Sequence, residues 1–325
     1  MKYIPCTLDE EKEILSYLGF DSFEEFISFV PIDLIIKNKY KISKPLSEIE
    51  LIDHMKNISS NNKVGISFIG AGAYDRYVPS IVDFISARSE FYTAYTPYQA
   101  EVSQGTLQYI YEYQSMICSL SGMDAANASL YDGGSAVAEA TLLSYNYNKK
   151  NKILVSPYLN RNYLSVLESY VKNLNLEIIM LPKSKQGILA LDSIQEFINE
   201  DVSSIIIQSP NYFGQLENWS AVKEKINNTN TLLIAVSEPI ALSTIKSPGE
   251  SGADIYVGEG QSLGNYLSYG GPYLGIIAVK KNLIRKLPGR IVGKTSDING
   301  KTGYALTLQP REQHIRRERA TSNIC

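Results

Sequence analysis

Apolar residues fall into short continuous runs through the second half of the chain, separated by stretches in which they recur every third or fourth residue. The runs predict strands that are buried on both faces, as in a parallel sheet covered by helices. The recurring pattern predicts the covering helices, so this half is expected to be an α/β layered domain with right-handed crossovers. The predicted strands are Ile153–Ser156, Glu177–Leu181, Ser204–Ser209, Leu232–Val236, Asp254–Val257 and Gly275–Val279. The predicted helices between them are Tyr163–Asn173, Asp192–Ile198 and Trp219–Ile226.

Residues 1–60 show a different pattern, in which short amphipathic segments each follow a Ser or Thr that has Glu three residues later. In such a capping box the two side chains satisfy each other's free backbone N–H groups, which marks the start of a helix. The pairs are Thr7 with Glu10, Ser22 with Glu25, and Ser47 with Glu50. Because this region has little core by itself, we expect residues 1–60 to form a helical extension that docks on something larger, and residues 61–325 to form the large domain.

The stretch Ser89–Gln108 fits neither periodicity. Its tyrosines at 92, 95 and 98 have helical spacing, but the intervening threonines and proline disfavour a helix. We predict an irregular segment that holds tyrosine rings in a cleft; the alternative is a buried loop whose hydroxyls are simply hydrogen-bonded. A regular helix is predicted from Gly105 to Leu120, ended by Gly122.

The composition narrows the classes of partner. Hydrophobic residues make up 44% of the 325 residues and the net charge is −3, which favours neither nucleic acid nor an anionic membrane as partner. No apolar run approaches the ~18 residues of a membrane span, and no hydrophobic leader is recognised. Cys6, Cys118 and Cys325 lack CxxC spacing, so we expect a reducing, cytoplasmic compartment. Because His54 and His314 are the only histidines beside these three cysteines, no His/Cys metal site is expected.

Two glycine-rich turns have the composition of phosphate-binding loops. The first, Gly70–Gly72, lacks the third glycine of a dinucleotide fingerprint, because Asp75 stands there and would repel a pyrophosphate. It is interpreted as a strained turn that permits close backbone approach near an active site. The second places Gly133, Gly134 and Ser135 at a helix start, where free N–H groups can cradle a phosphate. Without other support, a tight turn with close helix packing is the favoured interpretation of the second.

Two further motifs carry competing interpretations. Gly260–Gly264 matches the GxSxG nucleophile elbow, and Asp297 and His314 follow in hydrolase order. The next residues, 265–272, do not form a helical pattern, so we interpret this as a chance match. Glu238 ends an apolar strand, where a carboxylate can hold a cationic ring nitrogen, as in pyridoxal phosphate enzymes. A loop cap or an ion pair is the alternative.

Long irregular motifs, in a fixed order, run along almost the whole chain. They are Phe68–Pro79, Arg88–Gln108, Ala126–Gly133, Gln208–Gly214, Pro248–Gly264, Tyr269–Gly275, Pro288–Gly293 and Leu308–Cys325. On these motifs the chain closely resembles the glycine cleavage system P-protein family, and within it the first subunit of the two-subunit glycine dehydrogenase (decarboxylating). The resemblance implies a fold-type-I pyridoxal-phosphate scaffold, similar to aspartate aminotransferase, with a mostly parallel sheet.

The resemblance also implies partners and a reaction. The chain would pair with a second subunit, doubled to an α2β2 assembly. Together they would decarboxylate glycine with pyridoxal 5'-phosphate and pass the aminomethyl group to the lipoyl arm of H-protein. Relatives continue into a small C-terminal domain, which we expect to be missing after Cys325.

The Schiff-base lysine of this family lies in the second subunit, some way before a Gly-Gly-Pro. Counting back from Gly270-Gly271-Pro272 reaches Gln261, which cannot form an imine. The resemblance therefore implies that the partner subunit, and not this chain, binds pyridoxal phosphate covalently. A self-sufficient pyridoxal-phosphate decarboxylase or aminotransferase and a non-catalytic scaffold remain the alternatives.

Side chains of the irregular segment are the ones that such a subunit would lend to its partner's active site. Hydroxyls and amides can orient a carboxylate and a phosphate without adding charge. The residues expected to reach across are Tyr95, Thr96, Tyr98, Gln99 and Gln104, with Tyr74 and Asp75 lining the same entrance. Ser237-Glu238-Pro239 departs from the Ala-Asp-Pro of relatives, which weakens any role for that acid.

Overall fold

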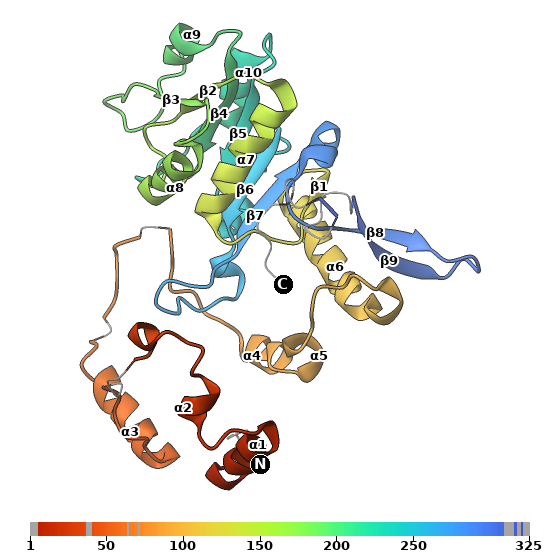
Figure 1. Cartoon of the computed structure of the whole chain (residues 1–325). Helices are drawn as coiled ribbons and strands as arrows, with labels where there is room; N and C mark the ends of the chain where they lie inside the picture. The colour runs from red at the N-terminus through yellow and green to blue at the C-terminus, as the bar shows by residue number, and fades with distance from the viewer. Residues whose placement is uncertain are drawn as a thin grey trace. The chain divides into compact units, whose positions relative to one another are not determined.

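The computed structural model describes residues 6–36, 41–63, 65–70, 72–308, 315, 316 and 320. The chain divides into two compact units, Met1–Ile66 and Ser67–Cys325 (Figure 1). Predictions that involve His314 and Cys325 lie outside the described residues. Across the described ranges, no helix combines the length and the apolar character needed to cross a membrane.

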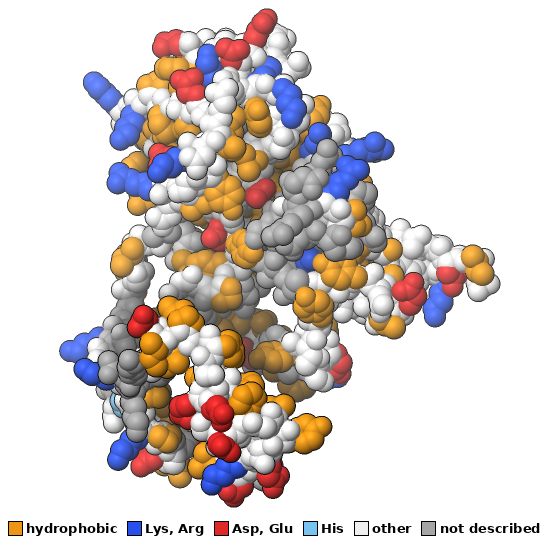
Figure 2. All heavy atoms as spheres, in the orientation of Figure 1, with side chains coloured by type: hydrophobic (Ala, Val, Ile, Leu, Met, Phe, Trp, Pro, Cys, Tyr) orange, Lys and Arg blue, Asp and Glu red, His pale blue; other side chains and the backbone are white. Residues whose placement is uncertain are grey.

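The first unit consists of short helices. The capping boxes predicted at the starts of α1 and α3 are both confirmed. The third is half formed, because Ser22 accepts the N–H of Glu25 while the Glu25 carboxylate accepts the N–H of Asp21. Of the described residues here only Leu15 is buried, and hydrophobic side chains are prominent on the visible surface (Figure 2). The elements are α1 (Leu8–Leu18), α2 (Phe23–Phe26), η1 (Ile32–Leu34) and α3 (Glu48–Ser59).

The second unit is built on a seven-stranded sheet, in which all six predicted strands are confirmed. The spatial order is β1-β7-β6-β5-β4-β2-β3. Strands β2 to β6 run parallel to one another, whereas β7 runs antiparallel to β6 and β1 antiparallel to β7. The strands are β1 (Ala125–Ala126), β2 (Lys152–Val155), β3 (Glu177–Met180), β4 (Val202–Gln208), β5 (Leu232–Val236), β6 (Ile255–Glu259) and β7 (Gly275–Val279).

Helices cover both faces of the sheet, as predicted (Figure 1). Successive side chains of a strand point to opposite faces, so Ile206 packs in one core while Ile205 and Ile207 pack in the other. Burying each of these side chains fully stabilises the fold by roughly 1.5–3 kcal/mol. One face carries α7 (Gly133–Asn148) and α8 (Arg161–Val171). The other carries α6 (Gln104–Ser121), α9 (Ser193–Phe197) and α10 (Trp219–Ile226).

A β-hairpin that the sequence patterns did not reveal packs on α6. Strands β8 (Ile291–Ser296) and β9 (Thr302–Thr307) pair antiparallel and share a small core with Leu107 of α6. Helix α6 ends at Gly122, which adopts a left-handed conformation with φ 69°, as predicted. Of the predicted irregular segment Ser89–Gln108, residues 93–99 are irregular, whereas short helices form at both its ends. The remaining elements are α4 (Ser80–Ser86), α5 (Ser89–Tyr92), η2 (Ala100–Val102), η3 (Pro239–Ser243), η4 (Gln261–Leu263) and η5 (Lys281–Lys286).

Candidate functional site

The carboxyl ends of the central parallel strands carry a group of polar side chains at one edge of the sheet. Glu238 follows β5, Glu259 ends β6, and Gln261 lies two residues beyond. Gly133 begins α7 at the same edge, because its N–H contacts Glu259. We call these four residues the rim. Ligands of open α/β sheets bind beyond the carboxyl ends of the strands, so the rim is the candidate site of this chain.

Glu259 is the most enclosed charged group of the rim, with 5% of its surface exposed. One carboxylate oxygen accepts the N–H of Gly133 at 2.9 Å. The other accepts the N–H groups of Gln261 and Leu274, both at 3.0 Å. Burial raises the pKa of Glu259, while these three donors oppose the rise because they favour the charged form.

The start of α7 is closely packed. Asp132 caps the helix, since its carboxylate accepts the Ser135 N–H at 2.7 Å. A Cβ atom on Gly133 would lie 2.5 Å from the hydroxyl oxygen of Tyr163, so only glycine fits there. A Cβ atom on Gly134 would lie 3.1 Å from a methyl carbon of Val166 on α8. These contacts have the form of a tight turn with close helix packing, the alternative to a phosphate loop.

Gln261 is buried, and both the oxygen and the nitrogen of its side-chain amide are hydrogen-bonded. Its oxygen accepts the backbone N–H of Tyr74 at 3.1 Å, and its nitrogen donates to the Asn265 carbonyl at 2.7 Å. The structure thus brings the Tyr74 backbone to the rim. Gly72 lies nearby with φ +86°, and a Cβ on it would approach the side-chain nitrogen of Asn160 to 2.6 Å. This confirms the predicted close backbone approach at the first glycine-rich turn.

Glu238 acts as a loop cap. Its carboxylate accepts the N–H of Ala241 at 3.1 Å at the start of η3, and it also accepts the hydroxyl of Ser262. The hydroxyl of the GxSxG serine is therefore bound to a carboxylate. The turn η4 spans three residues and no helix follows it, which supports the interpretation of a chance match to the hydrolase motif.

The residues predicted to contribute to a partner's active site differ in their exposure to solvent. The side chain of Tyr95 is 74% exposed, and Gln99 is exposed as well. Thr96 between them is buried, so it anchors the segment. Tyr98 is half exposed, and its hydroxyl oxygen accepts a hydrogen bond from the guanidinium of Arg290 at 3.2 Å. Tyr95 and Gln99 are thus exposed, whereas Thr96 and Tyr98 are held within the chain.

Gln104 is hydrogen-bonded to the β8–β9 hairpin of its own chain. Its amide nitrogen donates to the carbonyl of Tyr304 in β9, and its amide oxygen accepts the Tyr304 N–H, both at 2.9 Å. Gln104 therefore holds the hairpin on α6 and has a structural role within the chain. Asp75 is exposed, and Tyr74 stacks beneath the guanidinium of Arg76, 5.5 Å from the ring centre.

Sequence reasoning did not single out three residues of this region. Glu259 was overlooked because it stands just before the GxSxG match. Its position at the end of an apolar strand could have indicated a functional carboxylate. Tyr163 was predicted only as part of a helix. Burial is the main cause that raises the pKa of its hydroxyl, and the charge of Glu259 is the second. Arg290 lies between β7 and β8, where no pattern pointed to Tyr98.

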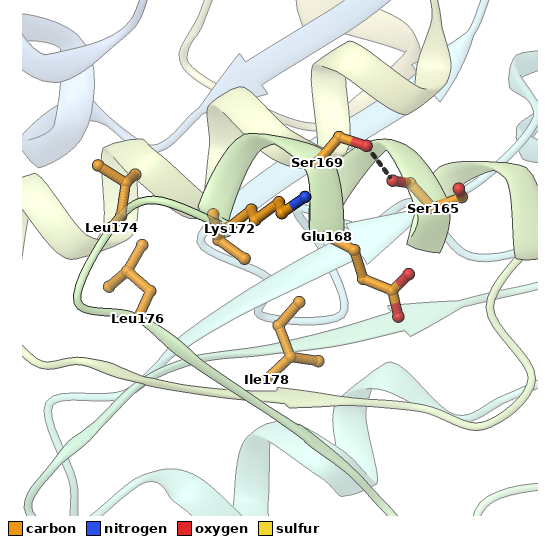
Figure 3. A pocket seen from close by; sticks show the side chains of 8 residues that line it. Ser165, Glu168, Ser169, Lys172, Leu174, Leu176 and Ile178 are labelled. Carbon is orange, nitrogen blue, oxygen red and sulfur yellow. Dashed lines mark hydrogen bonds between the residues drawn. The ribbon is translucent and has the colours of Figure 1, made fainter.

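A separate hollow of about 380 Å³ lies between α8 and the edge strand β3 (Figure 3). Apolar side chains, including Leu174, Leu176 and Ile178, form one side, and Glu168 and Lys172 lie at the other. The Ser169 hydroxyl donates to the Ser165 carbonyl within the helix, so it is satisfied locally. The hollow lacks the convergent backbone N–H groups of the rim, which therefore remains the candidate site.

Comparisons with known proteins agree with this geometry. Solved structures with the same fold include a sphingosine-1-phosphate lyase from Burkholderia pseudomallei K96243, with TM-score 0.55, 10% identity, and coverage of 83% of this chain and 66% of that chain. They also include a cysteine desulfurase from Thermococcus onnurineus NA1, with TM-score 0.53, 15% identity, and coverage of 74% and 60%. The fold-type-I pyridoxal-phosphate architecture expected from the sequence is thereby confirmed.

Closer similarities identify the family. A crystal structure of glycine decarboxylase (P-protein) of the glycine cleavage system matches the whole chain and 73% of its own, with TM-score 0.88 and 39% identity. The probable glycine dehydrogenase (decarboxylating) subunit 1 of Moorella thermoacetica is 49% identical, and that of Endomicrobium trichonymphae is 50% identical. Each match covers all of this chain and 73% of the relative. The family profile described as glycine cleavage system P-protein matches residues 1–325, and the chain therefore belongs to this family.

Proposed function

We propose that this chain is subunit 1 of a two-subunit glycine dehydrogenase (decarboxylating) and that it lends side chains to an active site carried by subunit 2. The observation that carries the proposal is Gln261, which occupies the expected place of the lysine with its amide committed to Tyr74 and Asn265. A chain without an imine-forming residue at this place needs a partner for the chemistry. The relatives named subunit 1 imply such a partner.

The residues of this chain do not fit pyridoxal 5'-phosphate as a covalent cofactor. Besides Gln261, the helix start that would receive its phosphate already binds the carboxylate of Glu259. We therefore assign the cofactor to the partner subunit. The pyridoxal-phosphate enzymes that share the fold support the cofactor for the assembly as a whole.

The surface of residues 68–102 supports the interaction with a partner. Many large apolar side chains along this segment of the chain are exposed, and such a concentration is typical of a protein-binding surface. Three members of α4 and α5, namely Ile81, Ile85 and Phe91, line a hollow of about 430 Å³ together with Tyr109. The exposed residues of this series are Phe68, Ile69, Tyr74, Tyr77, Ile81, Phe84, Ile85, Phe91, Tyr92, Tyr95, Tyr98 and Val102.

Within this surface, Tyr95 and Gln99 are proposed to bind glycine in the partner's site. A phenol and an amide can donate hydrogen bonds to the glycine carboxylate. Neither adds a positive charge, which would stabilise the carboxylate and so oppose decarboxylation. Thr96 anchors the segment between them, and the Arg290 guanidinium positions Tyr98. Tyr74 and Asp75 would line the entrance.

The remaining steps belong to the assembly. The carboxyl carbon of glycine leaves as carbon dioxide, and the aminomethyl group passes to the lipoyl group of H-protein. We propose an α2β2 stoichiometry and a cytoplasmic location, in keeping with the free thiols of Cys6 and Cys118.

The test is Tyr95→Phe in the chain co-purified with subunit 2. Loss of one hydrogen bond to a charged group costs roughly 1.5–3 kcal/mol, so glycine–bicarbonate carbon exchange should fall by about tenfold to a hundredfold. Tyr170→Phe, at an exposed tyrosine on α8 outside this surface, is the control and should leave exchange unchanged. Equal exchange by the two variants would contradict the proposed role of Tyr95. Assembly without exchange in the native pair would support a non-catalytic scaffold instead.

A further inference from the structure

The helix start at the rim has the features of an anion site, yet the chain itself supplies the anion. Helix N-termini bind phosphates because their first N–H groups are free and the helix dipole is positive there. In α7 the first of these groups, the Gly133 N–H, is bound to Glu259 at 2.9 Å. The Ser135 N–H is bound to Asp132 at 2.7 Å. Two carboxylates thus stand where a phosphate would be received.

Glu259 is held there by a complete set of donors. Its three partners, the N–H groups of Gly133, Gln261 and Leu274, come from three different elements and converge on one buried carboxylate. Each partner donates, so the hydrogen bonding favours the ionised side chain. A buried carboxylate is costly unless it is compensated in this manner. The arrangement is that of a bound anion, with the anion attached to β6.

The space beside Glu259 is closed as well. The Tyr163 hydroxyl from α8 lies so near Gly133 that a Cβ there would be 2.5 Å away, and Glu259 Cβ would be 3.1 Å from the same position. Gln261, bound to the Tyr74 backbone, closes the side toward residues 72–74. A phosphate could enter only by displacing the carboxylate.

We propose that Glu259 is a built-in counter-anion that replaces a phosphate at the start of α7 and thereby excludes phosphorylated cofactors from the rim of this chain. The inference deepens the proposed function, on which it rests for the assignment of the cofactor to subunit 2. It adds a physical cause: absence of the lysine alone would prevent covalent attachment, whereas Glu259 prevents binding of the phosphate.

The test is Glu259→Ala in the full chain, with inorganic phosphate as the probe. The substitution releases three convergent N–H groups, so phosphate should bind and stabilise the variant. At a concentration about ten times the dissociation constant, the Tm should rise by about 2 °C relative to chloride at equal ionic strength. The native chain gives the general stabilisation by phosphate as a kosmotrope, and the rise in the variant should exceed that baseline by this amount. Asp132→Asn/Glu259→Ala should respond more strongly, because Asn caps a helix as well as Asp and carries no charge.

Glu217→Ala is the matched control. Its carboxylate accepts the Leu189 N–H at 3.0 Å and the Asn211 amide at 2.9 Å, and neither donor is a backbone N–H of a helix start, although α10 begins two residues after Glu217. This control should lose stability without gaining a response to phosphate. If Glu259→Ala folds only when phosphate is present, the proposal is supported. If it is equally stable or equally unfolded in phosphate and chloride, the proposal is wrong.

A second measurement separates this inference from the proposed function. The native chain alone is incubated with pyridoxal 5'-phosphate, reduced with borohydride and mapped by mass spectrometry. Specific labelling of one lysine would overturn the assignment of the cofactor to subunit 2. Absence of such labelling, together with no phosphate response in Glu259→Ala, would overturn the role of Glu259 alone.

Discussion

Replacing Gln114 by Leu should detach the β8–β9 hairpin from α6. The Gln114 side chain is buried, and its amide nitrogen donates to the Val292 carbonyl while its oxygen accepts the Val292 N–H, both at 2.9 Å. Val292 is 2% exposed, so water cannot replace either bond. Leaving a buried polar group unsatisfied costs about 1–3 kcal/mol. Two such groups give an expected loss of about 2–6 kcal/mol.

Hydrogen exchange at the Val292 amide is the most direct assay of this change. A loss of ~2 kcal/mol or more should speed exchange by about thirtyfold or more. Gln108→Leu is the control, because Gln108 lies on the exposed side of the same helix and bonds only Glu112. That variant should change stability by no more than ~0.5 kcal/mol. Unchanged protection of Val292 in Gln114→Leu would refute the reasoning. The same variant should also disturb Tyr98, because Arg290 directly precedes β8.

Two further predictions concern the scaffold. Burial raises the pKa of Glu139 to about 7, so its proton is held more tightly in the folded chain and stability should fall as pH rises from about 4.5 to about 7. Glu139→Gln should therefore be more stable than the native chain by about 1–3 kcal/mol at pH 8 and equally stable near pH 4.5. If denaturant melts give the same difference in unfolding free energy between the two chains at both pH values, this prediction is wrong. A Cβ on Gly249 would lie 1.9 Å from the Gly122 carbonyl oxygen, so Gly249→Ala should lower the free energy of unfolding by about 1–3 kcal/mol or more. Gly105→Ala on α6 meets no atom within 4 Å and should raise stability by about 0.5–1 kcal/mol; the opposite order in thermal melts would refute the packing argument.

The sequence predicted the layered fold well because burial on two faces leaves a strong signature. Runs such as Leu232–Val236 are apolar throughout, and all five residues of β5 are buried. The same signature carries no information on direction, so the antiparallel course of β7 was not predictable from its equally apolar run. The β8–β9 hairpin was missed because the residues that hold it, Leu107 and two glutamines of α6, are distant from it in the sequence.

Site residues were harder to predict because a residue type does not reveal its hydrogen-bonding partner. Gln104 and Gln99 look alike in the sequence, yet one clamps Tyr304 within the chain and the other is exposed. Gln261 was found through its place before Gly270-Gly271-Pro272, which is a family resemblance rather than a physical pattern. The role of Glu259 depends on N–H groups from α7 and from the loop before β7, which only the folded chain brings together.

The central claim is that the active site is shared between this chain and a lysine-bearing subunit 2. Its most direct measurement is the exchange of carbon between glycine and bicarbonate in the presence of lipoylated H-protein, made on each chain alone and on the co-purified pair. The account predicts exchange by the pair and none by this chain alone, because Gln261 cannot form an imine. Exchange catalysed by this chain alone would contradict it.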